Sequence, residues 1–389
     1  MSESSQEPCL SKQELAERER ALWQAELEWQ RQNPNPDLSD FHFLLEREMR
    51  RTGALRLPSL DIAMWPESFW TRIDVSNTDK FNDRFIEVPA EVRAGGVEKW
   101  FTGAHNFFSL IIVYAFIVER DFGGFLLAYS MLAFFFWPMI YAVIYFSGKG
   151  TAGGVRYNRQ AQLVHVDDGE GRVAHIPWRH VVPLVSVGVA PSSQMRLRAP
   201  LPHAQVEYNK LLEIGRSERD LKYLRSIVDP YAFSGTMSPS DHSSAWSNLQ
   251  RLEFLRRYMA DGIAAIQPDP EMVAKGRLED PEDYDNPKEA WRVDWWSRNV
   301  MYPLDRAWHY LAFGPWLDKR ARARAEAFRW PQEVEDLCGP NPDLRGLDTR
   351  PVKARTDFYY RPDGATCKLV DRQGRLLPIE SRARRSTKT

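Results

Sequence analysis

The chain has little cysteine and almost no net charge. Only three of its 389 residues are cysteines, at Cys9, Cys338 and Cys367, and no two of them have the close spacing of a metal-binding pair. An odd, scattered set predicts a reducing compartment and no disulfide framework. Lysine and arginine number 52 against 53 acidic residues, which gives a formal charge of -1. Because such a chain has no overall positive field, we do not expect nucleic acid as a partner.

Catalytic motifs and a cleavable signal are also missing. The chain contains no Gly-x-Ser-x-Gly and no His-Glu-x-x-His motif. Asp241, His242 and Ser243 are neighbours in sequence, whereas the members of a catalytic triad converge from distant positions. The start, MSESSQEPCLSKQE, has no basic region followed by an apolar core, so no cleavable signal is expected. We therefore predict a protein that is not an enzyme and binds no cofactor or metal.

Two long apolar runs dominate what is present, at residues 100–118 and 125–147, and neither contains Asp, Glu, Lys or Arg. About twenty such residues cross a hydrocarbon layer about 30 Å thick. The connection ERDFGG suits only a tight turn, so residues 100–147 predict a transmembrane hairpin. We expect its membrane-spanning residues to include Trp100, Phe108, Val118, Phe125, Trp137, Pro138 and Phe146. The alternative is a buried core hairpin of a soluble protein, but core helices are usually about 11–12 residues long.

The basic residues near the hairpin predict its orientation. Positions 93, 99, 149, 156 and 159 outside the two runs are Lys or Arg, against a lone Arg120 in the turn. Because basic flanks stay in the cytoplasm, we expect a multi-pass membrane protein with both termini cytoplasmic. His105 and Asn106 lie near the cytoplasmic end of the first run, and we expect them to face lipid headgroups.

After the hairpin the apolar period changes to two, which predicts a small antiparallel β domain over residues 150–232. The predicted strands are 155–157, 162–166, 172–176, 184–189, 195–199 and 210–215, followed by a closing helix over 217–229. A further strand at 85–88, before the hairpin, is expected to pair with this sheet. Opposed strands bring His165 and His175 near each other and near Asp167, which suggests zinc, but no fixed ligand spacing is present and exposed strand histidines are the commoner case.

Helical segments are predicted on both sides of these regions. In the arm, residues 1–99, Ser11 and Glu14 form a capping box for a helix over 11–33 whose narrow apolar stripe predicts light packing on the body. A shorter helix is expected over 41–51. Residues 234–248 are interpreted as a polar linker, and Asn248 as the cap of the next helix. An aromatic helical domain then extends to residue 340, followed by a β-hairpin within 350–380 and a basic tail, 381–389.

The aromatic helical domain supplies most of the candidate contacts with lipid or protein. A tryptophan-rich helix is predicted to begin at Asn286 and Pro287, and part of its wide aromatic face is expected to rest on the membrane surface or on the apolar hairpin. A basic helix follows over 319–329. For the basic run, a solvated helix face and attraction to anionic lipid are equally good interpretations. The candidate partner or lipid contacts are Trp178, Trp291, Trp295, Trp296, Trp308, Lys319, Arg320, Arg322 and Arg324.

The succession of these segments resembles a known arrangement. The apolar hairpin, the strands and the run Ile176-Pro177-Trp178-Arg179 are similar to bacterial membrane-anchored PH-like domains. With residues 252–259 and 330–334 added, the chain resembles an uncharacterised proteobacterial family of two-helix inner-membrane proteins, often encoded near type VI secretion toxin genes. The resemblance implies an α+β membrane protein with a transmembrane hairpin, a PH-like β domain and a Trp-rich helical region.

For function, the resemblance implies an immunity or accessory protein whose partner is a toxin or secretion component. Two other functions stay open. One is a membrane-anchored lipid-binding sensor or scaffold, and the other is a lipid-linked membrane enzyme.

Overall fold

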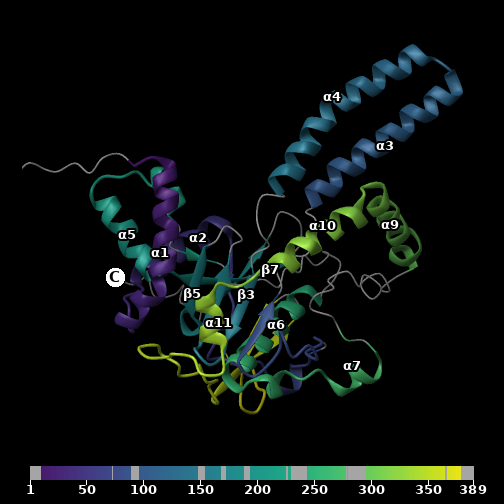
Figure 1. Cartoon of the computed structure of the whole chain (residues 1–389). Helices are drawn as coiled ribbons and strands as arrows, with labels where there is room; N and C mark the ends of the chain where they lie inside the picture. Colours follow the sequence, from purple (N-terminus) through teal and green to yellow (C-terminus); the bar gives the residue numbers. More distant parts are fainter. Residues whose placement is uncertain are drawn as a thin grey trace, which may run out of the picture.

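The computed structural model describes residues 10–71, 73–88, 96–147, 154–167, 172–187, 193–224, 227–228, 243–276, 278, 295–363 and 366–377. These residues form an α+β molecule from which a two-helix hairpin projects (Figure 1). The predicted linker before residue 243, the start of the Trp-rich helix with Trp291, and the basic tail lie outside the described residues. So do the side chains of Phe146 and Arg324.

Two four-stranded antiparallel sheets form the body. The first has the order β2-β3-β4-β5 and the second the order β1-β6-β7-β8. Their bounds are β1 Leu55–Arg56, β2 Phe85–Val88, β3 Gly154–Asn158, β4 Leu163–Asp167, β5 Val173–Pro177, β6 Val182–Val187, β7 Ser193–Pro200 and β8 Ile227–Val228. Strand β2 pairs with β3, with Phe85 opposite Asn158, as the sequence predicts.

The largest core side chains lie between these sheets and helix α6, Ser243–Asp261. Trp178 stands edge-on to Tyr157, with ring centroids 5.9 Å apart, and is only 1% exposed. The prediction that Trp178 contacts a partner or lipid is therefore wrong, because this indole fills the core. Helix α6 begins earlier than predicted, at Ser243, so Asn248 is inside the helix and not its cap.

Two predicted elements of the β domain are different in the structure. Residues 210–215 are not a strand, because they continue helix α5, Pro202–Glu213, which starts with proline in its first turn. The predicted helix over 217–229 is replaced by a short 3-10 turn, Asp220–Tyr223, and by β8. The second sheet therefore gains an edge strand where the sequence pattern favoured a helix.

Helix α1, Lys12–Gln32, begins with the predicted capping box: Ser11 accepts a hydrogen bond from the Glu14 backbone N–H at 3.2 Å, and the Glu14 carboxylate accepts one in return. Its packing is not light. Leu22, Trp23 and Leu27 are buried, because α1 lies across α5 and β5. The prediction of a lightly packed arm helix is thus wrong.

The remaining elements complete the surface of the body. They are α2 Ser39–Thr52, α7 Pro270–Ala274, a π-helical turn Ser297–Met301, α9 Tyr302–Leu311, α10 Gly314–Ala327 and α11 Gln332–Cys338. An antiparallel pair, β9 Phe358–Asp363 and β10 Thr366–Asp371, occupies the region where the sequence predicts a terminal β-hairpin. Tyr360 of β9 is buried and donates to the Leu249 carbonyl of α6 at 3.2 Å.

The apolar hairpin consists of α3, Gly96–Glu119, and α4, Phe122–Ser147. Both helices are long and apolar enough to cross a membrane, over Lys99–Glu119 and Phe122–Tyr145. Only 22% of the apolar window of the first helix is buried inside the protein, and none of that of the second. This exposure contradicts the alternative of a buried core hairpin. Since the hairpin leaves the body between the paired strands β2 and β3, the first sheet lies near its base.

Candidate membrane and partner contacts

Helix α9 ends against the base of the apolar hairpin. The hydroxyl of Thr102 donates to the Ala312 carbonyl at 2.8 Å, and the side-chain amide of Asn106 donates to the Leu311 carbonyl at 2.6 Å. The last carbonyls of a helix have no partner within it. Polar side chains of α3 therefore cap the end of α9. This contact corrects the expectation that Asn106 faces lipid headgroups.

A close approach of ring and backbone accompanies these hydrogen bonds. A Cβ atom added to Gly103 would lie 2.7 Å from the Trp308 ring, closer than real contacts allow. Glycine is therefore needed at this position for α9 to reach α3. Trp308, a predicted lipid or partner contact, is half-buried here and its ring packs on α3.

His105 lies between the two helices of the hairpin. Its exposed fraction is 8%, and its Nε2 accepts a hydrogen bond from the Trp137 indole at 3.2 Å. With Nε2 as acceptor, Nδ1 carries the proton and donates to the Asn106 side-chain oxygen at 3.1 Å. The expectation of an imidazole facing headgroups is wrong, because His105 joins α3 to α4.

Helix α10 is tied to both helices of the hairpin. The ammonium group of Lys99 lies 2.9 Å from the Asp318 carboxylate, and Arg320 donates to the Ile144 carbonyl at 3.3 Å. Arg320 is thus half-buried against α4, while Lys319 and Arg322 are exposed. Of the predicted basic contacts that the structure describes, these two are the exposed ones.

Exposed aromatic and aliphatic side chains gather on the same unit. Trp295 and Trp296 are 72% and 56% exposed, as expected for contact residues. The others are Leu304, Tyr310, Phe313 and Trp316. We call these six residues the apolar surface of α9–α10. Large exposed apolar patches mark contacts with lipid or protein, so these six residues are candidates for such a contact.

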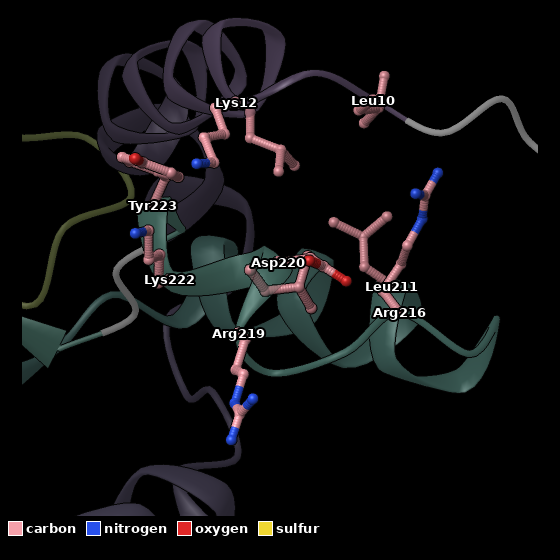
Figure 2. Close-up of a pocket in the computed structure, with 10 residues that line it drawn as sticks. Leu10, Lys12, Leu211, Arg216, Arg219, Asp220, Lys222 and Tyr223 are labelled. Carbon is pink, nitrogen blue, oxygen red and sulfur yellow. The ribbon is translucent and has the colours of Figure 1, made fainter.

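A cationic groove lies on the other side of the body, between the start of α1 and the end of α5 (Figure 2). It encloses about 310 Å³, and its basic residues are Lys12, Arg216, Arg219 and Lys222, with Asp220 as its acidic residue. Apolar side chains, including Leu15, Leu211 and Leu221, complete the lining. Lys12 and Lys222 lie at one end beside Tyr223, Arg216 lies at the other end, and Arg219 points away.

Sequence reasoning missed this groove. Its residues come from the start of α1 and from a segment about two hundred positions later, and no local pattern marks either set. The mixture of cationic rim and apolar lining suits an acidic segment that also carries apolar side chains.

A buried carboxylate holds the two helices of this groove together. The Glu26 side chain of α1 accepts hydrogen bonds from the His203 backbone N–H at 3.1 Å, at the first turn of α5, and from the Gln30 amide at 3.1 Å. A negative group is favoured at a helix N-terminus. Burial nevertheless raises the pKa of Glu26 to about 7, against the weaker opposing effect of these hydrogen bonds.

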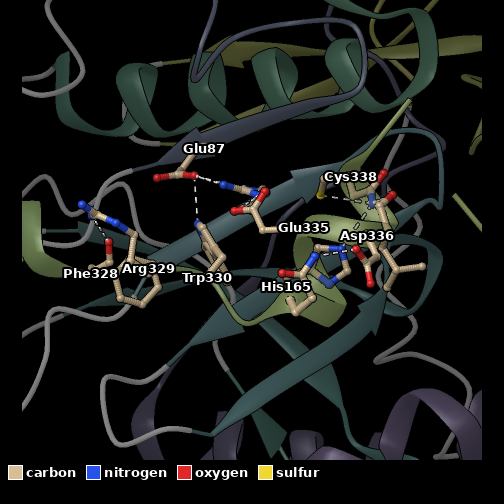
Figure 3. A network of polar contacts seen from close by, with 12 residues as sticks. Glu87, His165, Phe328, Arg329, Trp330, Glu335, Asp336 and Cys338 are labelled. Carbon is tan, nitrogen blue, oxygen red and sulfur yellow. Dashed lines mark hydrogen bonds and ion pairs between the residues drawn. The ribbon is translucent and has the colours of Figure 1, made fainter. Parts of the chain in front are cut away.

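A polar network fixes α11 to the first sheet (Figure 3). The Arg156 guanidinium contacts the Glu87 carboxylate at 2.6 Å and the Glu335 carboxylate at 3.1 Å. The Trp330 indole also donates to Glu87, at 2.9 Å. Arg156 is buried and stacks on the Phe85 ring with its carbon 4.3 Å from the centroid. The network therefore has a structural role.

His165 and His175 meet directly across β4 and β5, with their Nδ1 atoms 2.9 Å apart. Both are buried, so the expectation of exposed strand histidines is wrong. Burial holds the pKa of His165 well below its usual value, and the neighbouring His175 adds to this effect. Within the described ranges, no group of three or more His, Cys, Asp or Glu side chains is placed to hold a metal ion. The suggested zinc site with Asp167 therefore has no support in the structure.

Comparisons with known proteins add no further assignment. No protein-family model, no curated protein and no solved structure matches the chain.

Proposed function

We propose that the protein is a non-enzymatic binding protein anchored in the bacterial inner membrane by the α3–α4 hairpin, with both termini in the cytoplasm. The observation that carries the proposal is the exposed apolar hairpin, which leaves a polar body between two paired strands. Basic residues such as Lys99 at its open end support the orientation. The anchor keeps the body at the cytoplasmic face of the membrane, with the cationic groove on the side of the body away from α9 and α10.

The body supports the proposal of a PH-like module. Four antiparallel strands are followed by a second sheet, and α6 packs its buried residues Leu252, Leu255 and Met259 into the shared core. In this interpretation the apolar hairpin is an insertion after the first strand of the module, β2. A module of this kind is a binding platform, and fold alone does not assign its ligand.

The proposed partner is a protein with an acidic, partly apolar segment that enters the cationic groove. Following the resemblance of the sequence, this partner is a toxin or another component of a type VI secretion system. The protein would then be its immunity or accessory protein. Charge complementarity at the groove supplies fast association and selectivity for such a partner.

Co-expression with the toxin encoded beside the gene tests this function. Cells that make the toxin should survive with the intact protein and die with the Lys12→Glu, Lys222→Glu double variant. The control variant Lys275→Glu, Lys353→Glu makes the same charge change at exposed sites outside the groove, and it should protect fully. Equal death with and without the protein would contradict an immunity role.

A lipid-binding sensor is the second candidate, favoured by the apolar surface of α9–α10 and the exposed Lys319 and Arg322 beside it. Its test is to measure amide hydrogen exchange of α9 and α10 with the full chain in nanodiscs, and to compare nanodiscs with and without anionic lipid. A sensor predicts slower exchange with anionic lipid, whereas equal exchange contradicts it.

A lipid-linked enzyme is less favoured, because Asp318 at the membrane face is already engaged by Lys99.

A further inference from the structure

We infer that α9 and α10 form a third membrane-embedded element, a short helical hairpin whose turn at Phe313 enters the same leaflet from the cytoplasmic side. Its partner is the lipid beside the α3–α4 hairpin. The inference rests on the proposed anchoring of that hairpin. It adds a contact of α9 and α10 with lipid, which the anchoring by α3 and α4 does not require. Figure 1 shows the corner between α9 and α10 beside the lower end of α3.

The depth of this element follows from its contacts with α3. The capping donors Thr102 and Asn106 lie inside the span Lys99–Glu119. At about 1.5 Å per residue, Asn106 is about 10 Å deeper along α3 than Lys99. The end of α9 is therefore held inside the apolar layer.

The path of α10 from the turn at Phe313 back toward the cytoplasm is consistent with this depth. Asp318 of α10 pairs with Lys99, at the cytoplasmic end of the same span. Phe313 precedes Asp318 by five positions, which is about 7 Å along a helix. Two independent contacts thus place the turn one to two helical turns below the level of Lys99.

The hydrogen bonds have the form that a lipid environment demands. A helix end in water is satisfied by solvent, but in hydrocarbon every backbone carbonyl needs a protein partner. The carbonyls of Leu311 and Ala312 receive side-chain donors from a neighbouring apolar helix. The tight turn between the helices is made by Phe313 itself, at φ 53°.

The side chains that remain exposed at this level suit lipid. Tyr310, Phe313 and Trp316 are 57%, 58% and 54% exposed. In lipid the apolar surface of these rings is removed from water, which is favourable. Aromatic residues of this kind are enriched where lipid tails meet headgroups. Lys319 and Arg322 follow on α10 and are placed for the phosphate layer.

Spin labels at single cysteines test the depth of the turn. The full chain carries Cys9→Ser, Cys338→Ala and Cys367→Ser, and is reconstituted in nanodiscs of zwitterionic and anionic phospholipid. Phe313→Cys is the test site. Phe134→Cys in α4 is the lipid reference and Phe43→Cys in α2 the aqueous reference, since both side chains are highly exposed. Collision rates with oxygen and with a water-soluble nickel chelate are measured by electron paramagnetic resonance.

The label at 313 should collide with the nickel chelate several-fold less often than the label at 43, and with oxygen nearly as often as the label at 134. Trp316→Cys provides a second site with the same expected result if the first substitution disturbs the turn. A label at 313 as open to the chelate as the label at 43 overturns the inference. If the label at 134 is also open to the chelate, the anchoring itself has failed; if it is shielded, only the α9–α10 assignment has.

Discussion

At the scale of single residues, two hydrogen-bonded contacts join helices that are far apart in the sequence. Thr102 and Asn106 of α3 cap the end of α9, 210 and 205 positions away. The Glu26 carboxylate of α1 accepts a hydrogen bond from the His203 backbone N–H at the first turn of α5.

The buried carboxylate Glu26 predicts a pH-dependent stability. Its pKa is raised from 4.5 to about 7, so the folded state binds a proton more tightly than the unfolded state. Its contribution is most favourable at low pH and is lost as the pH rises through about 7. The difference is on the order of 3 kcal/mol, at about 1.36 kcal/mol per pKa unit.

Thermal unfolding in detergent from pH 5 to pH 8 measures this effect. The melting temperature of the intact protein, minus that of Glu26→Gln, should fall across this range, because the amide does not titrate. A constant difference between the two proteins would show that Glu26 is ionised at both ends of the range.

Gly103 predicts a steric effect at the junction of α3 and α9. Gly103→Ala places a methyl group 2.7 Å from the Trp308 ring, and relief of such overpacking typically costs about 1–3 kcal/mol. We expect α9 to detach, with faster tryptic cleavage at the exposed Arg306. The matched control is Gly123→Ala, whose new methyl meets only an ordinary contact at 3.5 Å. Equal cleavage rates in the two variants would refute this packing.

At the scale of elements, periodicity predicted the spans and the strands β3 to β7 but not the ends of the β domain. Long apolar runs and alternating strands can be recognised within a short window of sequence. Residues 210–215 were misread because six residues do not distinguish a strand from the end of a helix, and the proline that starts α5 lies eight positions earlier. The cationic groove depends on that helix and was missed with it.

The Arg156 network predicts the attachment of α11 to the first sheet. Removing one partner of a buried ion pair costs about 3–5 kcal/mol, because the other charge is left unpaired. Arg156→Met should therefore lower the unfolding free energy strongly, because Glu87 and Glu335 both lose the guanidinium and Glu87 keeps only the Trp330 indole. Urea unfolding followed by tryptophan fluorescence measures the change. Arg84→Met, at an exposed position before β2, should unfold like the intact protein; equal midpoints for both variants would contradict the network.

At the scale of the whole molecule, the position of the hairpin matters more than its presence. It is inserted between β2 and β3, two strands that pair along their full length. The first sheet, α9 and α10 are thereby held at its base, whereas α1 and α5 lie on the side of the body away from α9 and α10 (Figure 1). The cationic groove lies between the start of α1 and the end of α5. The sequence predicted the hairpin from composition alone. The aromatic face of the Trp-rich helix was expected to rest on the membrane surface or on the hairpin, and Trp308 does pack on α3. The contacts of α10 with both helices of the hairpin were not expected, since they join segments about two hundred residues apart.

Alkaline carbonate extraction of isolated membranes tests the central claim most directly. The full chain should remain in the membrane pellet. A chain in which a short Gly/Ser linker replaces residues 96–147 should be released, because the apolar surface of α9–α10 alone buries too little apolar area in lipid to hold the body on the membrane. Recovery of the full chain in the carbonate supernatant, without detergent, would contradict the account.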